Sequence, residues 1–412
     1  MERETKEAVG IGAADAAVLP KRATSWLEID LDAFAHNVRT FRGLLAPGCR
    51  LAAVVKSNAY GHGAGLVAPV ALAEGAGLLA VGNLDEALSL RATVGPGAEI
   101  LVLGWVPPDG FEDAARADVE LTIYDPQVVA PLAAASRRAR RPVRVHLKVE
   151  TGTHRQGVDA ARLAQLAAAV HAADGLELRG LSTHFADIED TTDHGYAMRQ
   201  LELFRQAARA LEQAGLRPAL RHAACSAAAL LFPETHFDVA RAGIGLYGFW
   251  PSRETRVSAR ERGLDRIALR PVMSWRARIA QVKQVPAGAY VGYGRTYRTT
   301  RPSRIAVLPV GYYEGLDRSV SGRGHVLVRG RRAAILGRVC MNMTMVDVTD
   351  VPDLAAGDPV TLIGRSGDEV LRAEDLADWA GTIHYEIVSR VHPSVPRVPV
   401  RRDEPGGDAP AP

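Results

Sequence analysis

The chain has 412 residues, of which 47% are apolar and 24% charged, and a net charge of only +3. This length exceeds one typical hydrophobic core, so we expect two domains in an ordinary globular protein. The small net charge argues against nucleic acid as a partner, and no apolar stretch is long enough for a bilayer, so we expect no membrane association.

Cysteine usage indicates the compartment. Cys49, Cys225 and Cys340 are scattered, with neither a disulfide framework nor zinc spacing. We therefore expect a cytoplasmic protein without a metal site. Residues 1–23 contain several acidic residues and lack the hydrophobic region of a signal peptide. We expect 1–23 and 401–412 to be disordered tails.

The first elements of the chain are a strand and a helix. The apolar run Trp26–Leu31 predicts a short strand, and a helix is expected to begin at Asp32. Phe34, Val38 and Phe41 then recur at helical spacing.

An alternation of strands and helices follows. Ala-rich helical segments lie between most of the apolar strand-like runs, which are 51–55, 78–83, 99–104, 120–125, 143–150, 178–185, 220–226 and 239–248. Eight such repeats over about 230 residues predict a parallel (β/α)8 barrel of the TIM type, with a domain at 24–258. The strand at Trp26 is a ninth, so we expect it to pair with the second domain.

The pattern changes after about residue 260, where short strands alternate with turn residues. We therefore predict a C-terminal, mostly-β domain at 259–400. Within it, residues 374–381 are the only expected helix.

Lys56 is the first candidate for chemistry. In LAAVVKSNAYGHG (51–63) it ends a buried run and opens a Gly-rich turn. Barrels carry catalytic groups at such strand ends, and a desolvated amine can condense with a carbonyl. A lysine that extends from a strand end into water fits the same pattern. The chain holds only five lysines among its 50 Lys and Arg residues. This scarcity favours a role for Lys56 that needs an amine able to lose its proton, which arginine cannot do.

Further polar groups follow other predicted barrel strands. They are Lys148, Glu150, His154, Arg155, His184, Ser226 and Arg241, the last with Gly243 and Gly245 nearby. In a barrel these strand ends converge, and phosphate sites favour the last strands. Pyridoxal phosphate fits this description, because it has a phosphate and a carbonyl that could condense with Lys56.

Ordered motifs over nearly the whole chain indicate a family. They run from Trp26 to about Arg397 and include VVKSNAYGHG, HLKVETGTHRQG, STHFA, HAACSAAAL, RAGIGLYG, VGYGRTY, LPVGYYEG, GRVCMNMTMVDV and HYEIVSR. With them the chain resembles the alanine racemases, fold type III pyridoxal phosphate enzymes with a barrel and a β domain. The resemblance implies an isomerase that interconverts L-alanine and D-alanine and supplies D-alanine for peptidoglycan.

The resemblance implies two catalytic bases on opposite faces of the substrate. Lys56 would carry pyridoxal phosphate as a Schiff base and act as one base, and Tyr293 would be the other. A free tyrosine has a pKa near ~10, so Tyr293 would need cationic neighbours to act near neutral pH. Arg241 would face the pyridine nitrogen and keep it largely unprotonated, because a guanidinium holds its proton.

The remaining roles come from the same resemblance. His184 would lie near the ring and help to orient Arg241, and the phosphate would be held by Tyr60, Ser226, Gly243, Ile244 and Tyr385. Arg155, Tyr312 and Met341 would bind substrate. Lys148 matches a lysine that is often carbamylated (N6-carboxylysine), although an unmodified amine stays an alternative. Tyr293, Tyr312 and Met341 would reach the site of a partner subunit, which implies a head-to-tail homodimer.

Departures from the family pattern leave the substrate open. Cys225 replaces the usual asparagine, and we interpret it as a small core residue. Asn342 replaces the usual aspartate near the entry to the active site. A serine or broad-specificity racemase is therefore an alternative on the same scaffold. A related decarboxylase would lack Tyr293, and a non-catalytic pyridoxal phosphate carrier would lack the β domain.

Overall fold

The computed structural model describes residues 22–402, which form two compact units. The barrel unit comprises Asp30–Met273, Gly381–Val391 and Arg402, and the β unit comprises 22–29, Ser274–Ala380 and His392–Arg401. The tails predicted at 1–23 and 401–412 lie for the most part outside the described residues. The domain boundary expected at residue 258 stays a prediction.

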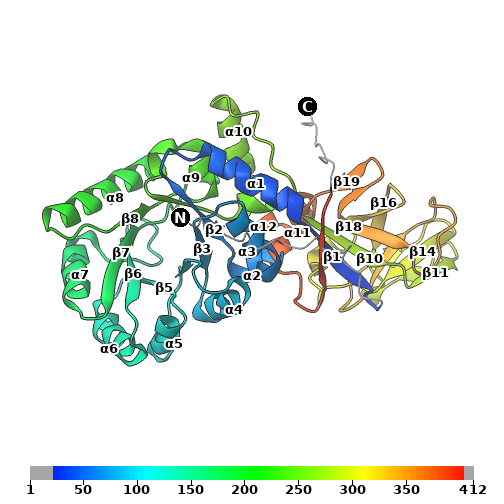
Figure 1. Ribbon diagram of the computed structural model, residues 1–412. Helices are drawn as coiled ribbons and strands as arrows, with labels where there is room; N and C mark the ends of the chain where they lie inside the picture. Colours follow the sequence, from blue (N-terminus) through cyan, green and yellow to red (C-terminus); the bar gives the residue numbers. More distant parts are fainter. Residues whose placement is uncertain (1–21, 403–412) are drawn as a thin grey trace, which may run out of the picture. The chain divides into compact units, whose positions relative to one another are not determined.

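The barrel unit is built on an eight-stranded parallel sheet (Figure 1). Its strands pair in the order β8-β7-β6-β5-β4-β3-β2-β9. They are β2 (Arg50–Val54), β3 (Leu78–Val81), β4 (Ile100–Val102), β5 (Glu120–Ile123), β6 (Val143–Lys148), β7 (Leu176–Ser182), β8 (Leu220–His222) and β9 (Val239–Ala242). Two backbone hydrogen bonds of 3.1 Å, from Asp238 to Arg221 and from Arg241 to Ala224, join the ends of this sheet. The predicted (β/α)8 barrel is confirmed.

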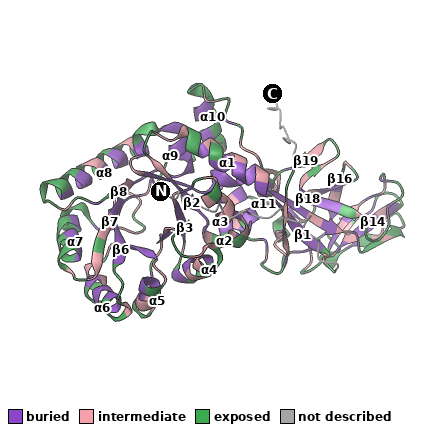
Figure 2. Cartoon of the chain, in the orientation of Figure 1, coloured by how far each residue is buried: buried purple, intermediate pink, exposed green. Residues whose placement is uncertain are grey.

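Helices surround this sheet, and their buried faces turn toward it (Figure 2). They are α1 (Leu31–Leu44), α3 (Ala64–Ala73), α4 (Leu84–Val94), α5 (Phe111–Arg116), α6 (Val129–Ala139), α7 (Ala160–Ala172), α8 (Gly195–Gln213), α9 (Ser226–Leu231), α10 (Arg253–Glu261) and α12 (His384–Ser389). In α1, the Asp30 carboxylate accepts hydrogen bonds from the first backbone N–H groups, which fixes the start of the helix. Phe34, Val38 and Phe41 are completely buried, as their spacing predicts.

The apolar runs that predicted the strands are buried because parallel strands are covered on both faces. In β2, Leu51, Ala52 and Ala53 have almost no exposed surface. A few buried polar side chains also lie in these strands, among them Glu120, His146, His222 and Arg241.

The β unit contains a ten-stranded, mostly antiparallel sheet and a small hairpin. Its strands are β1 (Ser25–Asp30), β10 (Met273–Arg278), β11 (Gln281–Val285), β14 (Ser303–Leu308), β15 (His325–Val328), β16 (Arg331–Leu336), β17 (Thr344–Asp347), β18 (Pro359–Ser366), β19 (Glu369–Leu371) and β20 (Arg397–Val400), with β12 (Tyr290–Val291) and β13 (Tyr297–Arg298) in the hairpin. β1 lies between β10 and β20, so the prediction that the strand at Trp26 pairs with the second domain is confirmed.

The prediction of a single helix in the C-terminal part is wrong. The expected helix is α11 (Ala373–Ala380), but HYEIVS forms α12 as well, and α12 belongs to the barrel unit. Ile387 and Val388 are buried, and the His384 ring lies 5.3 Å from that of Phe249. Tertiary packing thus forms a helix that is too short to show a clear period. Among residues 22–402, no helix is long and apolar enough to cross a membrane.

Candidate active site

Lys56 opens an unusual turn after β2. In α2 (Lys56–Tyr60) the residues from Ser57 to Tyr60 all have positive φ, between 52° and 55°, so this turn is left-handed. The geometry costs a non-glycine residue roughly 1–2 kcal/mol. Hydrogen bonds from the N–H of Gly61 to Ser57 O (3.0 Å) and from Gly63 to Asn58 O (2.9 Å) stabilise it.

The Lys56 amine lies where its proton is held weakly. Burial lowers its pKa and the charge of Arg155 adds to this, while Glu86 and Glu189 oppose the effect. Glu86 also accepts hydrogen bonds from the backbone N–H groups of Ser57 (2.5 Å) and Gly82 (2.7 Å), which ties the ends of β2 and β3 together. The lowered pKa gives Lys56 a larger fraction of neutral, nucleophilic amine than a lysine has in water.

A backbone cradle lies after β8 and β9. Ser226 begins α9, and its Oγ accepts hydrogen bonds from the N–H of Gly243 (2.9 Å) and Gly245 (3.3 Å). A Cβ at Gly243 would lie 2.4 Å from Tyr60 Oη, so only glycine allows this approach. Ile244 follows at the start of a buried 3-10 turn. Hydroxyls and backbone amides gathered in this way suit an anion.

Arg241 lies in β9 with its guanidinium buried. Nη1 donates to His222 Nδ1 (2.7 Å) and His222 O (2.9 Å), and Nη2 donates to the carbonyls of Thr183 (2.9 Å) and Ala223 (3.0 Å). Nη2 also lies 3.4 Å from His184 Nδ1. Burial lowers the pKa of Arg241 to about 10, which leaves it charged at neutral pH. Within the described residues Nε has no hydrogen-bond partner and remains free to donate.

Lys148 and Arg155 complete the cationic part of the site, and His184 lies beside it. Burial, with the charges of Arg241 and Arg155, lowers the pKa of Lys148 to about 8. Its Nζ lies 3.4 Å from Gln156 Oε1. Burial and the charge of Arg241 also hold the pKa of His184 well below its ordinary value, so His184 is neutral. Arg155 is exposed at the end of this segment.

Glu189 is a site residue that the sequence analysis missed. Tyr385 Oη donates a hydrogen bond of 2.8 Å to Glu189 Oε2, and the rings of Tyr60 and Tyr385 lie 6.2 Å apart. Burial raises the pKa of Glu189. Burial and the charge of Glu189 raise the pKa of Cys225 to about 12, so this thiol is neutral and buried, in agreement with its interpretation as a core residue.

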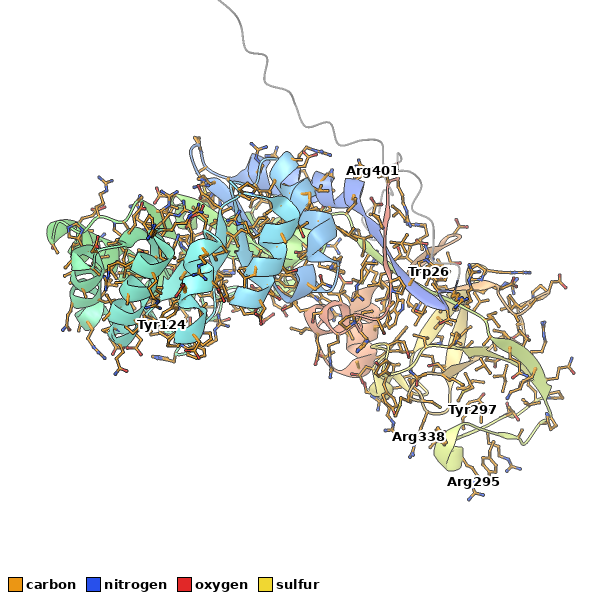
Figure 3. All side chains as sticks on the ribbon, turned by 60° about the horizontal axis from the view of Figure 1, so that its bottom comes forward. Trp26, Tyr124, Arg295, Tyr297, Arg338 and Arg401 are labelled. Atoms are coloured by element: carbon orange, nitrogen blue, oxygen red, sulfur yellow. The ribbon has the colours of Figure 1, made fainter. Side chains whose placement is uncertain are left out.

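The β unit carries Tyr293, Tyr312 and Met341, whose side chains are 72%, 42% and 56% exposed. Tyr293 lies between two glycines, and a Cβ on the second, Gly294, would lie 2.9 Å from the Arg338 guanidinium. Arg338, labelled in Figure 3, thus lies close to the backbone beside Tyr293.

Asn342, which follows Met341, donates a hydrogen bond of 2.7 Å to Glu314 Oε1. An aspartate at this position would place a second carboxylate beside Glu314, whereas the amide of Asn342 pairs with it. Asn342 itself carries no charge, and its amide is held by the Glu314 side chain.

The carboxyl ends of the strands are where (β/α)8 barrels carry their active sites. Lys56, Lys148, His184 and Arg241 all gather at or near these ends in the barrel unit. The fold and this cluster of side chains therefore define the protein as an enzyme of the (β/α)8-barrel class.

Comparison with known proteins narrows this class to one family. The family model described as the alanine racemase N-terminal domain matches residues 29–251, and the alanine racemase C-terminal domain matches 272–399. The chain belongs to the alanine racemase family.

Individual members of the family are similar to this chain over almost its full length. The alanine racemase of Desulfosudis oleivorans is 44% identical over 384 residues, covering 91% of this chain and 96% of its own. The crystal structure of alanine racemase from D-cycloserine-producing Streptomyces lavendulae is 40% identical with a TM-score of 0.85, covering 92% and 98%. That from Bartonella henselae, described with covalently bound pyridoxal phosphate, is 28% identical with a TM-score of 0.79, covering 92% and 100%.

Proposed function

We propose that this protein is a pyridoxal phosphate-dependent racemase that interconverts L-alanine and D-alanine. The observation that carries the proposal is the Lys56 amine of lowered pKa, in the same unit as the charged Arg241 with a free Nε–H. Family membership supports the same activity, since the similar proteins are named alanine racemases.

The residues of the barrel unit fit pyridoxal phosphate. Lys56 would hold its aldehyde carbon, and Arg241 would donate from Nε to the ring nitrogen. Ser226, the backbone of Gly243 and Ile244, Tyr60 and Tyr385 would hold the phosphate. When bound, the cofactor withdraws electrons from the substrate α-carbon. Because Arg241 is charged at neutral pH and keeps its own protons, it would leave the ring nitrogen unprotonated, which limits side reactions such as transamination.

Two groups of this chain would move the proton of the substrate. Lys56 Nζ would take or give the α-proton on one side, and Tyr293 Oη would do so on the other. Tyr293 lies in the β unit, and we propose that it acts in the site of a second subunit in a head-to-tail homodimer. Its 72% exposure supports this, as does that of the neighbouring Tyr312 and Met341. A monomer would then be nearly inactive.

Substrate selection would rest on three features. Arg155 would pair with the substrate carboxylate, together with Tyr312 and the backbone of Met341 from the partner. Tyr385, held by Glu189, would limit the size of the side chain. Because Asn342 replaces an acidic residue, serine racemisation is the second candidate. We further propose a cytoplasmic role in supplying D-alanine for peptidoglycan.

A substrate panel in heavy water tests this function. Purified protein with pyridoxal phosphate would be given L-alanine, L-serine and larger amino acids, and both the D-isomer and α-deuterium would be followed. Fast formation of α-deuterated D-alanine, with little from the others, is expected. A preference for serine would replace the substrate but keep the mechanism. Carbon dioxide release, or no α-deuterium in any product, would overturn the proposal.

A further inference from the structure

A line of buried polar side chains extends from Arg241 across the barrel interior. Arg241 Nη1 lies 2.7 Å from His222 Nδ1, and His222 Nε2 lies 2.8 Å from His146 Nδ1. His146 Nε2 lies 2.7 Å from Glu120 Oε2. Glu120, His146 and His222 are completely or almost completely buried. These groups come from β9, β8, β6 and β5.

The chemistry of the two ends fixes the direction of every hydrogen bond in this line. A guanidinium only donates and a carboxylate only accepts. Arg241 therefore donates to His222 Nδ1, which leaves the proton of neutral His222 on Nε2. His222 then donates to His146 Nδ1, and His146 donates from Nε2 to Glu120.

The charge states agree with this direction. Burial alone would raise the pKa of Glu120, but the hydrogen bond from His146 and its neighbouring cations outweigh it and lower that pKa. Arg144 Nε lies 3.1 Å from Glu120 Oε1. Burial holds the pKa of His222 well below its ordinary value, so it is neutral.

The backbone makes room for this line. A Cβ at Gly180 in β7 would lie 2.1 Å from His146 Nδ1, so any larger residue there would displace the imidazole. The pairing of β6 with β7 also shifts register between Val145 and His146. An apolar barrel interior needs neither feature.

We propose that Glu120 and His146 are positioning residues that act on Arg241 through His222. This inference rests on the proposed role of Arg241 toward pyridoxal phosphate. The line keeps His222 in the one tautomer that can accept from Arg241. The guanidinium edge formed by Nη1 is thereby held, and Nε stays directed to its ligand. Without His146, His222 can adopt the tautomer with its proton on Nδ1. Nδ1 would then be a donor opposite Arg241 Nη1, and the hydrogen bond between them would be lost.

The test uses two variants and a matched control. Glu120→Gln keeps the shape of the side chain and removes its charge. His146→Leu removes the hydrogen bonds that connect Glu120 to His222. Glu99→Gln is the control, because Glu99 lies just before β4 with its own ion pairs to Arg50 (2.8 Å) and Arg179 (3.5 Å), outside the line. Thermal unfolding of each variant reports folding.

Three readouts separate positioning from stability. They are the affinity of the cofactor-free protein for pyridoxal phosphate, the 15N chemical shift of the ring nitrogen in protein loaded with labelled cofactor, and the cofactor-free crystal structure. His146→Leu is expected to weaken cofactor binding about tenfold, by analogy with lost outer partners of metal-binding histidines. It should also move the 15N signal and lengthen the contact between Arg241 Nη1 and His222 Nδ1 beyond ~3.5 Å.

Glu120→Gln should move both cofactor readouts in the same direction by a smaller amount, while Glu99→Gln leaves them within twofold of the wild type. If the variants in the line match Glu99→Gln in affinity and 15N shift, the positioning role is refuted. If His146→Leu does not fold, Glu120→Gln decides alone. If the wild type binds no pyridoxal phosphate, the proposed function fails, and the Arg241 to His222 contact in the crystals still tests the inference.

Discussion

Lys148 is predicted to carry a carbamate. With its pKa lowered to about 8, roughly one amine in ten is neutral at pH 7, whereas at the ordinary value of 10.5 about one in 3,000 would be. Carbon dioxide reacts only with the neutral amine, forming an N–C bond and releasing one proton. The structure therefore raises the reactive fraction about 300-fold. The product is an anion beside the cations Arg155, Arg241 and Lys56, which lower the pKa of the amine.

The assay is 13C NMR of folded protein in 13C-labelled bicarbonate. We expect a carbamate signal that is present in the wild type and in Lys283→Arg, whose lysine is exposed in β11, and lost in Lys148→Arg. Any signal of the α-amino group, whose pKa is near ~8, persists in all three. At fixed carbon dioxide pressure, labelling from pH 7 to pH 8 should speed up about fivefold, because the neutral fraction rises from about a tenth to a half. If the wild type and Lys148→Arg give the same carbamate signals, the reasoning is wrong.

Three further outcomes are expected. Tyr293→Phe should lower racemisation at least ~100-fold, the size of one general base, with cofactor affinity unchanged, and full activity would refute the two-base assignment. Gly243→Ala should weaken pyridoxal phosphate binding in a titration, because its Cβ would meet Tyr60 Oη at 2.4 Å, whereas Gly43→Ala has no atom within 4 Å and should not. Tyr385→Ala should raise the rate with larger amino acids relative to alanine, and an unchanged ratio would remove Tyr385 as the size limit.

Much of the fold could be predicted because strands buried on both faces leave continuous apolar runs in the sequence. The run that ends at Lys56 is an example, since both its length and its place before a turn were visible. The helix α12 was not, because His384 and Ile387 are ordered by what they pack against. The left-handed geometry from Ser57 to Tyr60 was also hidden, since of these residues only Asn58 favours positive φ.

The site was predictable where it follows from strand ends alone. Lys56, Lys148 and Arg241 lie where the barrel rule places them. Glu189 could not be found, because its partner Tyr385 is 196 positions away and pairs with it only in the fold. His146 had one usable signal: it is two residues before Lys148, so both side chains lie on the same face of β6.

The left-handed turn after β2 has a consequence for how the enzyme fails under stress. Non-glycine residues in this conformation store conformational energy that the surrounding packing and hydrogen bonds hold in place. Relaxation of the turn toward right-handed geometry would redirect the Lys56 amine while the barrel stays folded. Inactivation by denaturant should therefore precede global unfolding, with the midpoint for activity below the midpoint for circular dichroism. The strained turn that carries the Lys56 amine would therefore set the upper limit of the conditions in which the enzyme works.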